Sequence, residues 1–296
     1  MRDRLCWFAC ALVALAGCGD DDAPMTTGDA GAIAAPVTGD WTCLGERGEP
    51  SGDTPSTFGA LLYDFSSDPH EGVPNLAVEI FPDNRVRPGC DDGCQRVVSD
   101  ASGNLTGVTA TEGTWFAYRA AAGVGSGGTT PFLTIGYNRL APPSGGTIEI
   151  PSITNTTVGF IPMFYLRTRL PGTAIVSGTI TDCTGETVEN ASLRLFQGDE
   201  ELVPGTGSTD FFVGYFNNQD LPDLYRTETN SNGLFAAANA AVTEAPLRVE
   251  LWGRLDGDTS ARRLACEEMQ VFADAVTTIT MGPLRNDYAA GSGCAD

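Results

Sequence analysis

Lysine is absent from this sequence of 296 residues and histidine occurs once, at His70, so all 17 cationic side chains are arginine. Aspartate and glutamate number 38, which gives a formal net charge of −21. Because such a surface repels phosphate, we do not expect the protein to bind nucleic acid. No apolar run after residue 17 approaches the length of a bilayer span, so no internal transmembrane helix is predicted.

Recognisable catalytic motifs are also lacking. The sequence has no Gly-x-Ser-x-Gly elbow and no His-Glu-x-x-His helix. His70 has no nucleophile that can be assigned to it. Carboxylates are so numerous that a close pair means little, although an envelope hydrolase with an unrecognised carboxylate site stays open as the alternative. We therefore expect a non-enzymatic protein that needs no cofactor.

Two acidic stretches bear on metal binding. Neither has the spacing of a dedicated calcium loop, so we assign no metal ligand and leave a calcium site open. The stretches are Asp256-Gly257-Asp258 and the group Asn217, Asn218, Asp220 and Asp223.

The N-terminus has the features of an export signal. Arg2 and Arg4 precede an apolar stretch from Leu5 to Leu15, which is too short to be a stable membrane anchor. The following Leu15-Ala16-Gly17-Cys18 resembles the lipobox of bacterial lipoproteins. This resemblance implies that residues 1–17 are removed as a signal peptide and that Cys18 receives a diacylglyceryl group and a further fatty acid such as palmitate. Two or more acyl chains anchor a protein stably to a membrane.

The residues after the lipobox bear on which membrane holds the protein and on the tether that follows the anchor. Gly19 follows the cysteine in place of an aspartate, so we prefer the outer membrane over the inner membrane. Residues 18–40 are rich in Gly, Ala, Asp and Thr without periodicity, which predicts a disordered tether with a span of roughly 25 Å.

Gapless repetition of two stretches predicts two modules. Residues 73–81 (VPNLAVEIF) match residues 188–196 (VENASLRLF), and both alternate apolar and polar side chains as half-buried strands do. Further along, Asp100–Leu105 parallels Asn230–Phe235, with a glycine at the same place in each turn.

The second copy is similar to the carboxypeptidase regulatory-like, or transthyretin-like, domain. Its matching positions are Gly178, Ile180, Asp182, Gly185, Val188, Asn190, Ala191, Leu193, Leu195, Asn230, Gly233 and Phe235. The first copy departs from the pattern, because Gly59 and Asp64 are spaced one residue wider and Leu76 replaces the alanine. The resemblance implies an all-β fold of two tandem seven-stranded Greek-key β-sandwiches, transthyretin-like or immunoglobulin-like, without the enzyme that such modules accompany.

These boundaries divide the chain. We expect the first sandwich over 41–151, a connector over 152–173 that is either a short helix or a packed segment, and the second sandwich over 174–296. The apolar middle of the connector, 160–166, argues against a free linker, so the modules should touch.

Nine cysteines fit an oxidising compartment. Cys6 and Cys10 leave with the signal peptide and Cys18 is lipidated, which leaves six candidates for three disulfides: Cys43, Cys90, Cys94, Cys183, Cys266 and Cys294. We favour a Cys183–Cys266 pair because both lie in the second module, where it would contribute about 4 kcal/mol. The other pairings stay open.

The best candidate for a binding surface is the long segment 197–229. Its aromatic residues are Phe211, Phe212, Tyr215, Phe216 and Tyr225. Long loops are often functional, although an additional hairpin packed on the sandwich is the stronger interpretation of this segment. The predicted function is a membrane-anchored binding or structural module of the cell envelope, with an envelope protein or a glycan as the candidate partner.

Overall fold

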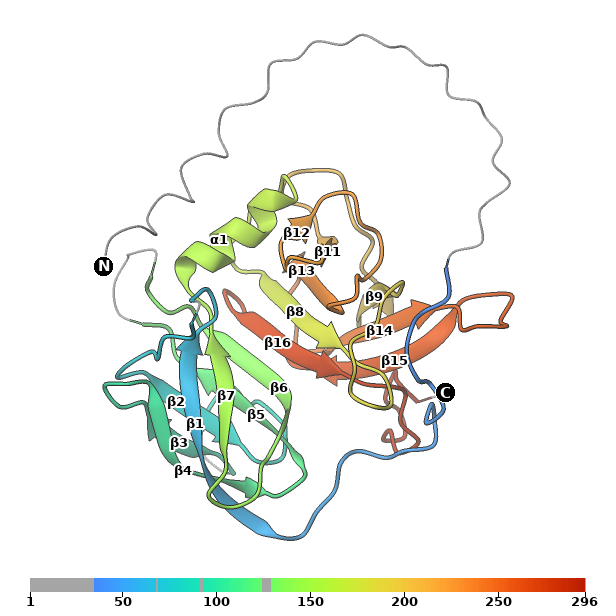
Figure 1. Cartoon of the computed structure of the whole chain (residues 1–296). Coiled ribbons are helices and arrows are strands. Elements are labelled where there is room, and N and C mark those ends of the chain that lie inside the picture. The colour runs from blue at the N-terminus through green and yellow to red at the C-terminus, as the bar shows by residue number, and fades with distance from the viewer. Residues whose placement is uncertain (1–34, 68, 91–92, 124–128, 296) are drawn as a thin grey trace. The chain divides into compact units, whose positions relative to one another are not determined.

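The computed structural model describes residues 35–67, 69–90, 93–123 and 129–295. It consists of β-strands and one helix, which confirms the all-β sandwich prediction (Figure 1). Cys18, the predicted signal peptide and most of the predicted tether lie outside the described residues, and so do Asp91 and Asp92 of the Cys90–Cys94 loop.

The first sandwich has the seven strands that were predicted. A three-stranded sheet of order β4-β1-β7 faces the β3-β2-β5-β6 part of a larger sheet. The strands are β1 (Pro55–Asp64), β2 (Ala77–Phe81), β3 (Gln95–Val98), β4 (Asn104–Thr111), β5 (Trp115–Ala120), β6 (Thr134–Leu140) and β7 (Thr147–Ser152). Along β1, Phe58, Ala60 and Leu62 are buried while their neighbours are less so, the period of two that turns one face of a strand to a core.

The second sandwich has nine strands, two of them only two residues long. A sheet of order β10-β9-β14-β15 faces the β12-β11-β13-β8-β16 part of the larger sheet. The strands are β8 (Ala174–Ile180), β9 (Ser192–Gln197), β10 (Glu200–Glu201), β11 (Phe212–Phe216), β12 (Pro222–Asp223), β13 (Leu234–Ala240), β14 (Leu247–Gly253), β15 (Arg262–Met269) and β16 (Val276–Met281).

The two sandwiches repeat the same pairing. In the first, β1 pairs antiparallel with β4 and parallel with β7; in the second, β8 pairs antiparallel with β13 and parallel with β16. Strands β2, β5 and β6 likewise correspond to β9, β14 and β15.

The turns repeat as well. Asn75 and Asn190 have φ of 55° and 66°, and Gly103 and Gly233 have φ of 85° and 63°. Asparagine tolerates this left-handed region better than most residues, and glycine has no Cβ to oppose it. Each asparagine N–H donates a 3.0 Å hydrogen bond to the segment that precedes the glycine turn. The internal repeat read from the sequence is therefore a repeat of backbone conformation.

One sheet runs through both sandwiches. Strands β6 and β16 pair in parallel, from Thr134 opposite Val276 to Tyr137 opposite Ile279, and this joins nine strands in the order β12-β11-β13-β8-β16-β6-β5-β2-β3. On β5, Phe116 and Tyr118 face the first core, whereas the intervening Ala117 faces the second. The modules are thus fused through a shared sheet, a closer arrangement than the contact between tandem domains that we expected.

Helix α1 (Asn155–Phe164) occupies the predicted connector, which resolves its two alternatives in favour of a helix. It ends where Leu166 adopts a left-handed φ of 55°. There the N–H groups of Leu166 and Arg167 donate to the carbonyls of Met163 and Pro162, the pattern of a Schellman cap. Within the part of the chain that the structure describes, no helix has the length and apolarity needed to cross a membrane.

The end of the predicted tether packs on the second sandwich, which corrects the expected 18–40 boundary. Val37 donates a 2.8 Å backbone hydrogen bond to Arg254, and both Val37 and Trp41 are buried. Gly253 makes room, since a Cβ there would lie 2.0 Å from a methyl group of Val37. Apolar burial holds this segment in place.

All six candidate cysteines form disulfides, but the favoured pairing is wrong. The pairs are Cys43–Cys183, Cys90–Cys94 and Cys266–Cys294, with Cα–Cα distances of 5.8, 5.4 and 5.5 Å. Cys183 lies in the turn after β8, where the N-terminal segment docks, and Cys266 lies in β15 beneath the C-terminal segment. The ends of the chain supply their partners. The Cys43–Cys183 bond therefore links the start of the expected first domain, 41–151, to the second sandwich.

Candidate functional site

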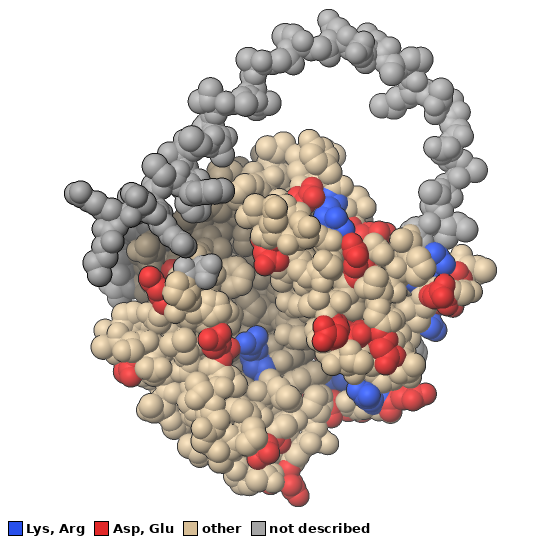
Figure 2. Space-filling model, in the orientation of Figure 1, with Lys and Arg blue, Asp and Glu red and all other residues tan. Residues whose placement is uncertain are grey.

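A groove of about 470 Å³ lies between the two sandwiches, and we call it the inter-sandwich groove. Its floor is the outer face of β8 and β16, and its walls are α1, the turn after β11 and the ends of β1 and β7. The view in Figure 2 shows a hollow in this region whose surface is mostly uncharged, with acidic side chains around it. Its volume is typical of small-ligand sites.

Aromatic rings form the walls of the groove. Phe160 and Phe164 of α1 are 44% and 47% exposed, and Phe65 after β1 is 50% exposed. The α1 rings lie 6.2 Å apart, while Val158 of the same helix is buried in a core cluster with Ile175. Helix α1 therefore faces the core on one side and presents aromatic rings on the other.

Hydroxyl groups form much of the floor. Alternation along the strands turns Val176 and Ile180 of β8 to the second core and leaves Ser177 and Thr179 facing the groove. On β16 the same alternation places threonines at positions 278 and 280 on the groove side. The floor thus carries a row of hydroxyl groups beside the apolar side chains of Ile175 and Val276.

The charged side chains of the groove are already engaged. Arg139 donates a 2.7 Å hydrogen bond to the carbonyl of Glu149. Asp220 accepts a 2.9 Å hydrogen bond from the amide of Asn232. Among the described residues that line the groove, Asp220 is the one carboxylate, so they contain no carboxylate pair of the kind a glycosidase uses.

His70 lies at the edge of the groove. Its ring stacks on Tyr63 at a centroid distance of 3.8 Å, and its Nδ1 lies 3.0 Å from the Glu149 carboxylate. Burial raises the pKa of the Tyr63 hydroxyl, which keeps it protonated and able to donate a hydrogen bond. This cluster supports the wall beside Tyr63.

The predicted aromatic surface on segment 197–229 is largely buried, which corrects that prediction. Phe212, Tyr215 and Phe216 belong to β11, which pairs with β13 and packs on the sandwich, and Phe211 is half-buried. Tyr225 alone of the five is open, at 90% exposure. The alternative of an additional packed hairpin is the one observed.

Tyr215 shows why these rings are inside. Its hydroxyl accepts a 2.9 Å hydrogen bond from the backbone N–H of Leu193, and burial raises its pKa to about 12. Phe216 is the one member of the predicted set that also borders the inter-sandwich groove. The other groove residues gave no signal in the sequence beyond an apolar helix and ordinary strand alternation.

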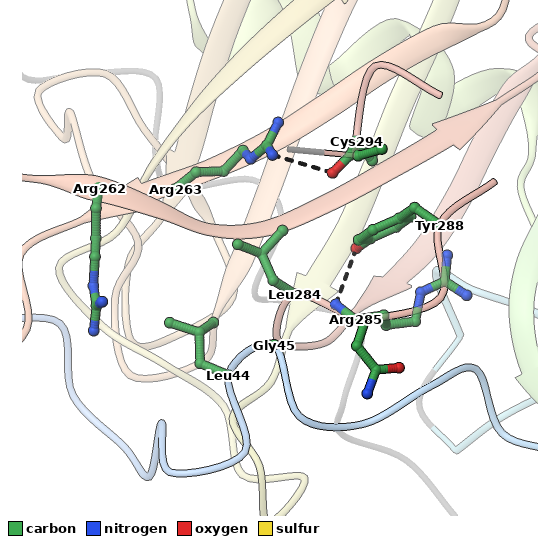
Figure 3. Close-up of a pocket in the computed structure, with 10 residues that line it drawn as sticks. Leu44, Gly45, Arg262, Arg263, Leu284, Arg285, Tyr288 and Cys294 are labelled. Carbon is green, nitrogen blue, oxygen red and sulfur yellow. Dashed lines mark hydrogen bonds between the residues drawn. The ribbon is translucent and has the colours of Figure 1, made fainter. Parts of the chain in front are cut away.

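A second pocket, of about 620 Å³, lies under the C-terminal segment (Figure 3). Arg263 donates to the carbonyl of Cys294, and Arg285 donates its backbone N–H to the hydroxyl of Tyr288. The guanidinium of Arg285 lies 3.4 Å from Glu267 and 3.0 Å from Glu49. Both arginines thus already bind carboxylates or carbonyls of the protein, and they hold the C-terminal segment in place.

The candidate calcium stretches serve as turns and ion pairs. Asp258 pairs with Arg262 at 3.2 Å, and the side chain of Asn217 accepts backbone hydrogen bonds from Gln219 and Leu221. Among the described residues, no group of three or more His, Cys, Asp or Glu side chains is placed to hold a metal ion.

Comparisons with known proteins identify no family. No family model matches the chain, and no curated protein matches it. Among solved structures, the minor pilin GBS52 of Streptococcus agalactiae aligns with 8% identity and a TM-score of 0.24, covering 80% of this chain and 98% of the pilin. The Bacillus anthracis TIE protein aligns with 9% identity and a TM-score of 0.23 over 78% of this chain.

The major pilin subunit BcpA of Bacillus cereus aligns with 6% identity and a TM-score of 0.22, covering 77% of this chain and 69% of the subunit. This chain spans 35% of the length of the TIE protein. TM-scores this low carry no argument about the fold or the site of this protein.

Proposed function

We propose that this protein is an exported lipoprotein, anchored to the outer membrane through Cys18, that binds another component of the cell envelope without catalysing a reaction. The lipobox sequence supports the anchor. Three disulfides support export, because such bonds persist in oxidising compartments. The resemblance of the second copy to regulatory-like accessory modules supports a binding role.

Exposed aromatic side chains around the inter-sandwich groove carry this proposal. Burying the exposed half of Phe160 or Phe164 would gain about 1 kcal/mol each, yet both rings are left partly open to water beside a concave floor. Contiguous exposed apolar surface of this kind marks binding sites. The single carboxylate among the described lining residues favours binding over hydrolysis.

Capture from envelope extract tests the proposal. The chain from residue 34 onward is immobilised, since residues 34–296 form one compact unit. We expect the double variant Phe160→Ser/Phe164→Ser to capture at least tenfold less material than the wild type. The matched control Val98→Ser/Val203→Ser removes two exposed apolar side chains outside the groove and should capture as the wild type does. Equal capture by the groove variant would refute the proposal.

A further inference from the structure

We infer that the ligand of the inter-sandwich groove is an uncharged glycan chain. The inference rests on the proposed binding function and names the chemical class of the partner. A sugar ring offers apolar C–H faces and a hydroxyl-bearing edge, and the groove offers a surface for each.

The floor supplies unoccupied hydrogen-bonding groups. The hydroxyls of Ser177, Thr179 and Thr280 make no hydrogen bond to another described residue, whereas that of Thr278 donates to the carbonyl of Ile135 at 3.1 Å. A hydroxyl is both donor and acceptor, so it can pair with a sugar hydroxyl in either sense. An entirely apolar ligand would leave these groups unpaired on binding, which is costly.

The strands of the floor do not favour an extended peptide. Strands β8, β16 and β6 lie inside the nine-stranded sheet, each with a paired strand on both sides. An added peptide strand needs an open sheet edge with free N–H and C=O groups. The floor offers side-chain hydroxyls in place of backbone groups.

The walls fit the faces of sugar rings. Phe160 and Phe164 are about half exposed and lie 6.2 Å apart along α1, with Phe65 also lining the groove. Aromatic rings combine a large apolar area with low side-chain entropy, which suits them to hold a ligand with an apolar face. Polar groups on the floor then fix its orientation.

Charge selects a neutral chain. The protein carries a net charge of −21, which repels acidic polymers. Within the groove, Arg139 and Asp220 each have a protein partner already. Neither an anionic nor a cationic ligand would find a dedicated counterion there.

Calorimetric titration with defined oligosaccharides tests the inference. The probes are cellohexaose, maltohexaose and chitohexaose, with a hexamer of galacturonic acid as the charged comparator. We expect at least one neutral hexamer to bind the chain from residue 34 onward and the acidic hexamer to bind at least tenfold more weakly.

Two matched pairs of variants locate the binding. Phe164→Ala and Thr179→Val should each weaken the neutral hexamer at least fivefold, since one removes a ring and the other removes only a hydroxyl. Tyr225→Ala also removes an aromatic ring and Thr106→Val also removes a hydroxyl, but at exposed positions outside the groove, so both should leave the affinity within twofold.

Three results would overturn the inference: no binding of any neutral hexamer, tighter binding of the acidic one, or affinity indifferent to both groove variants. If envelope capture then depends on Phe160 and Phe164 but yields a protein, the glycan inference falls while the binding function stands.

Discussion

Glu267 is a buried carboxyl group at the junction of the two sandwiches. It lies on β15 and is 6% exposed, beside Arg285, which also contacts the ring of Trp115 from the first sandwich. Burial raises the pKa of Glu267 to about 7 from its ordinary 4.5, although Arg285 acts in the opposite direction. The folded protein therefore holds this proton more tightly than the unfolded chain does.

This binding of a proton predicts a pH dependence of stability. The stabilisation is complete below the unfolded pKa and is lost as pH rises through the folded pKa, so the free energy of unfolding falls by up to about 3 kcal/mol between pH 4.5 and 7. Urea titrations of Glu267→Gln at several pH values should no longer show this fall in the free energy of unfolding. The exposed control Glu200→Gln should keep it, and an unchanged slope in Glu267→Gln would contradict the assignment.

Cys18 is the residue on which the proposed anchor depends. Cys18→Ala should abolish incorporation of radioactive palmitate, because the thiol is the proposed acyl acceptor. Cys10→Ala, within the proposed signal peptide, should retain the label. Labelling that persists in Cys18→Ala would show that the lipid is attached elsewhere or that another residue substitutes.

Single residues also show where prediction from the sequence failed. Phe212 and Tyr215 were named as a candidate binding surface and are buried, as the alternative of a packed hairpin requires. Phe160 and Phe164, which lie in the apolar stretch that argued against a free linker, are half exposed. A run of aromatic side chains indicates that a segment is apolar but not which neighbour covers it. Burial depends on strands that are distant in the sequence.

The strand-and-turn repeat is the element that the sequence predicted best. Asn75 and Asn190 are both left-handed, as are Gly103 and Gly233, and the local backbone requires these residue types. Local requirements leave a trace in the sequence. The pairing of β6 with β16 could not be predicted from the sequence. Each strand alternates inward-facing and outward-facing side chains in the same way whether or not another strand pairs with its edge.

The C-terminal segment covers a strand edge. In the repeat, β15 corresponds to β6. Strand β6 pairs with β5 on one edge and with β16 on the other, whereas β15 pairs with β14 on one edge. The other edge of β15 is instead occupied by residues 283–295: Leu284 donates to Leu264 and the Tyr288 hydroxyl donates to Cys266, both at 2.8 Å. Proteins cover such edges to prevent pairing with other chains.

Removing this cover should promote self-association. We expect a chain that ends after Gly282 and carries Cys266→Ser to have a larger mass in solution than the wild type, measured by light scattering. Loss of the disulfide should also lower stability by about 3–4 kcal/mol. The control Cys266→Ser/Cys294→Ser retains the segment and should keep the mass of the wild type. An unchanged mass of a folded truncated chain would argue against an edge-covering role.

At the scale of the whole molecule, one disulfide encloses the first sandwich. Cys43–Cys183 spans 140 residues, so the covalent loop contains all strands from β1 to β8 and helix α1. Such a loop stabilises the fold by about 5 kcal/mol in the chain-entropy model. Tension that enters at the N-terminal side crosses this bond directly, without passing through the first sandwich.

Single-molecule pulling from handles near residues 35 and 295 measures this path. With disulfides intact, extension is confined to the short stretch before Cys43 and to the chain between Cys183 and Cys266, and the latter releases roughly 280 Å. After reduction the chain from Cys43 to Cys294 can extend, and the release should grow to roughly 850 Å. Equal lengths before and after reduction would contradict the disulfide connectivity.

The proposed partner binds in the groove that the two sandwiches form together. Photo-crosslinking in the cells that produce the protein tests this binding, with a benzophenone side chain in place of Phe164 in the groove or of Val203, which is exposed elsewhere. Benzophenone inserts into C–H bonds of proteins and glycans alike. We expect a light-dependent adduct from position 164 and none from 203. No adduct at 164, or an equal adduct at both positions, would rule out specific binding in the groove.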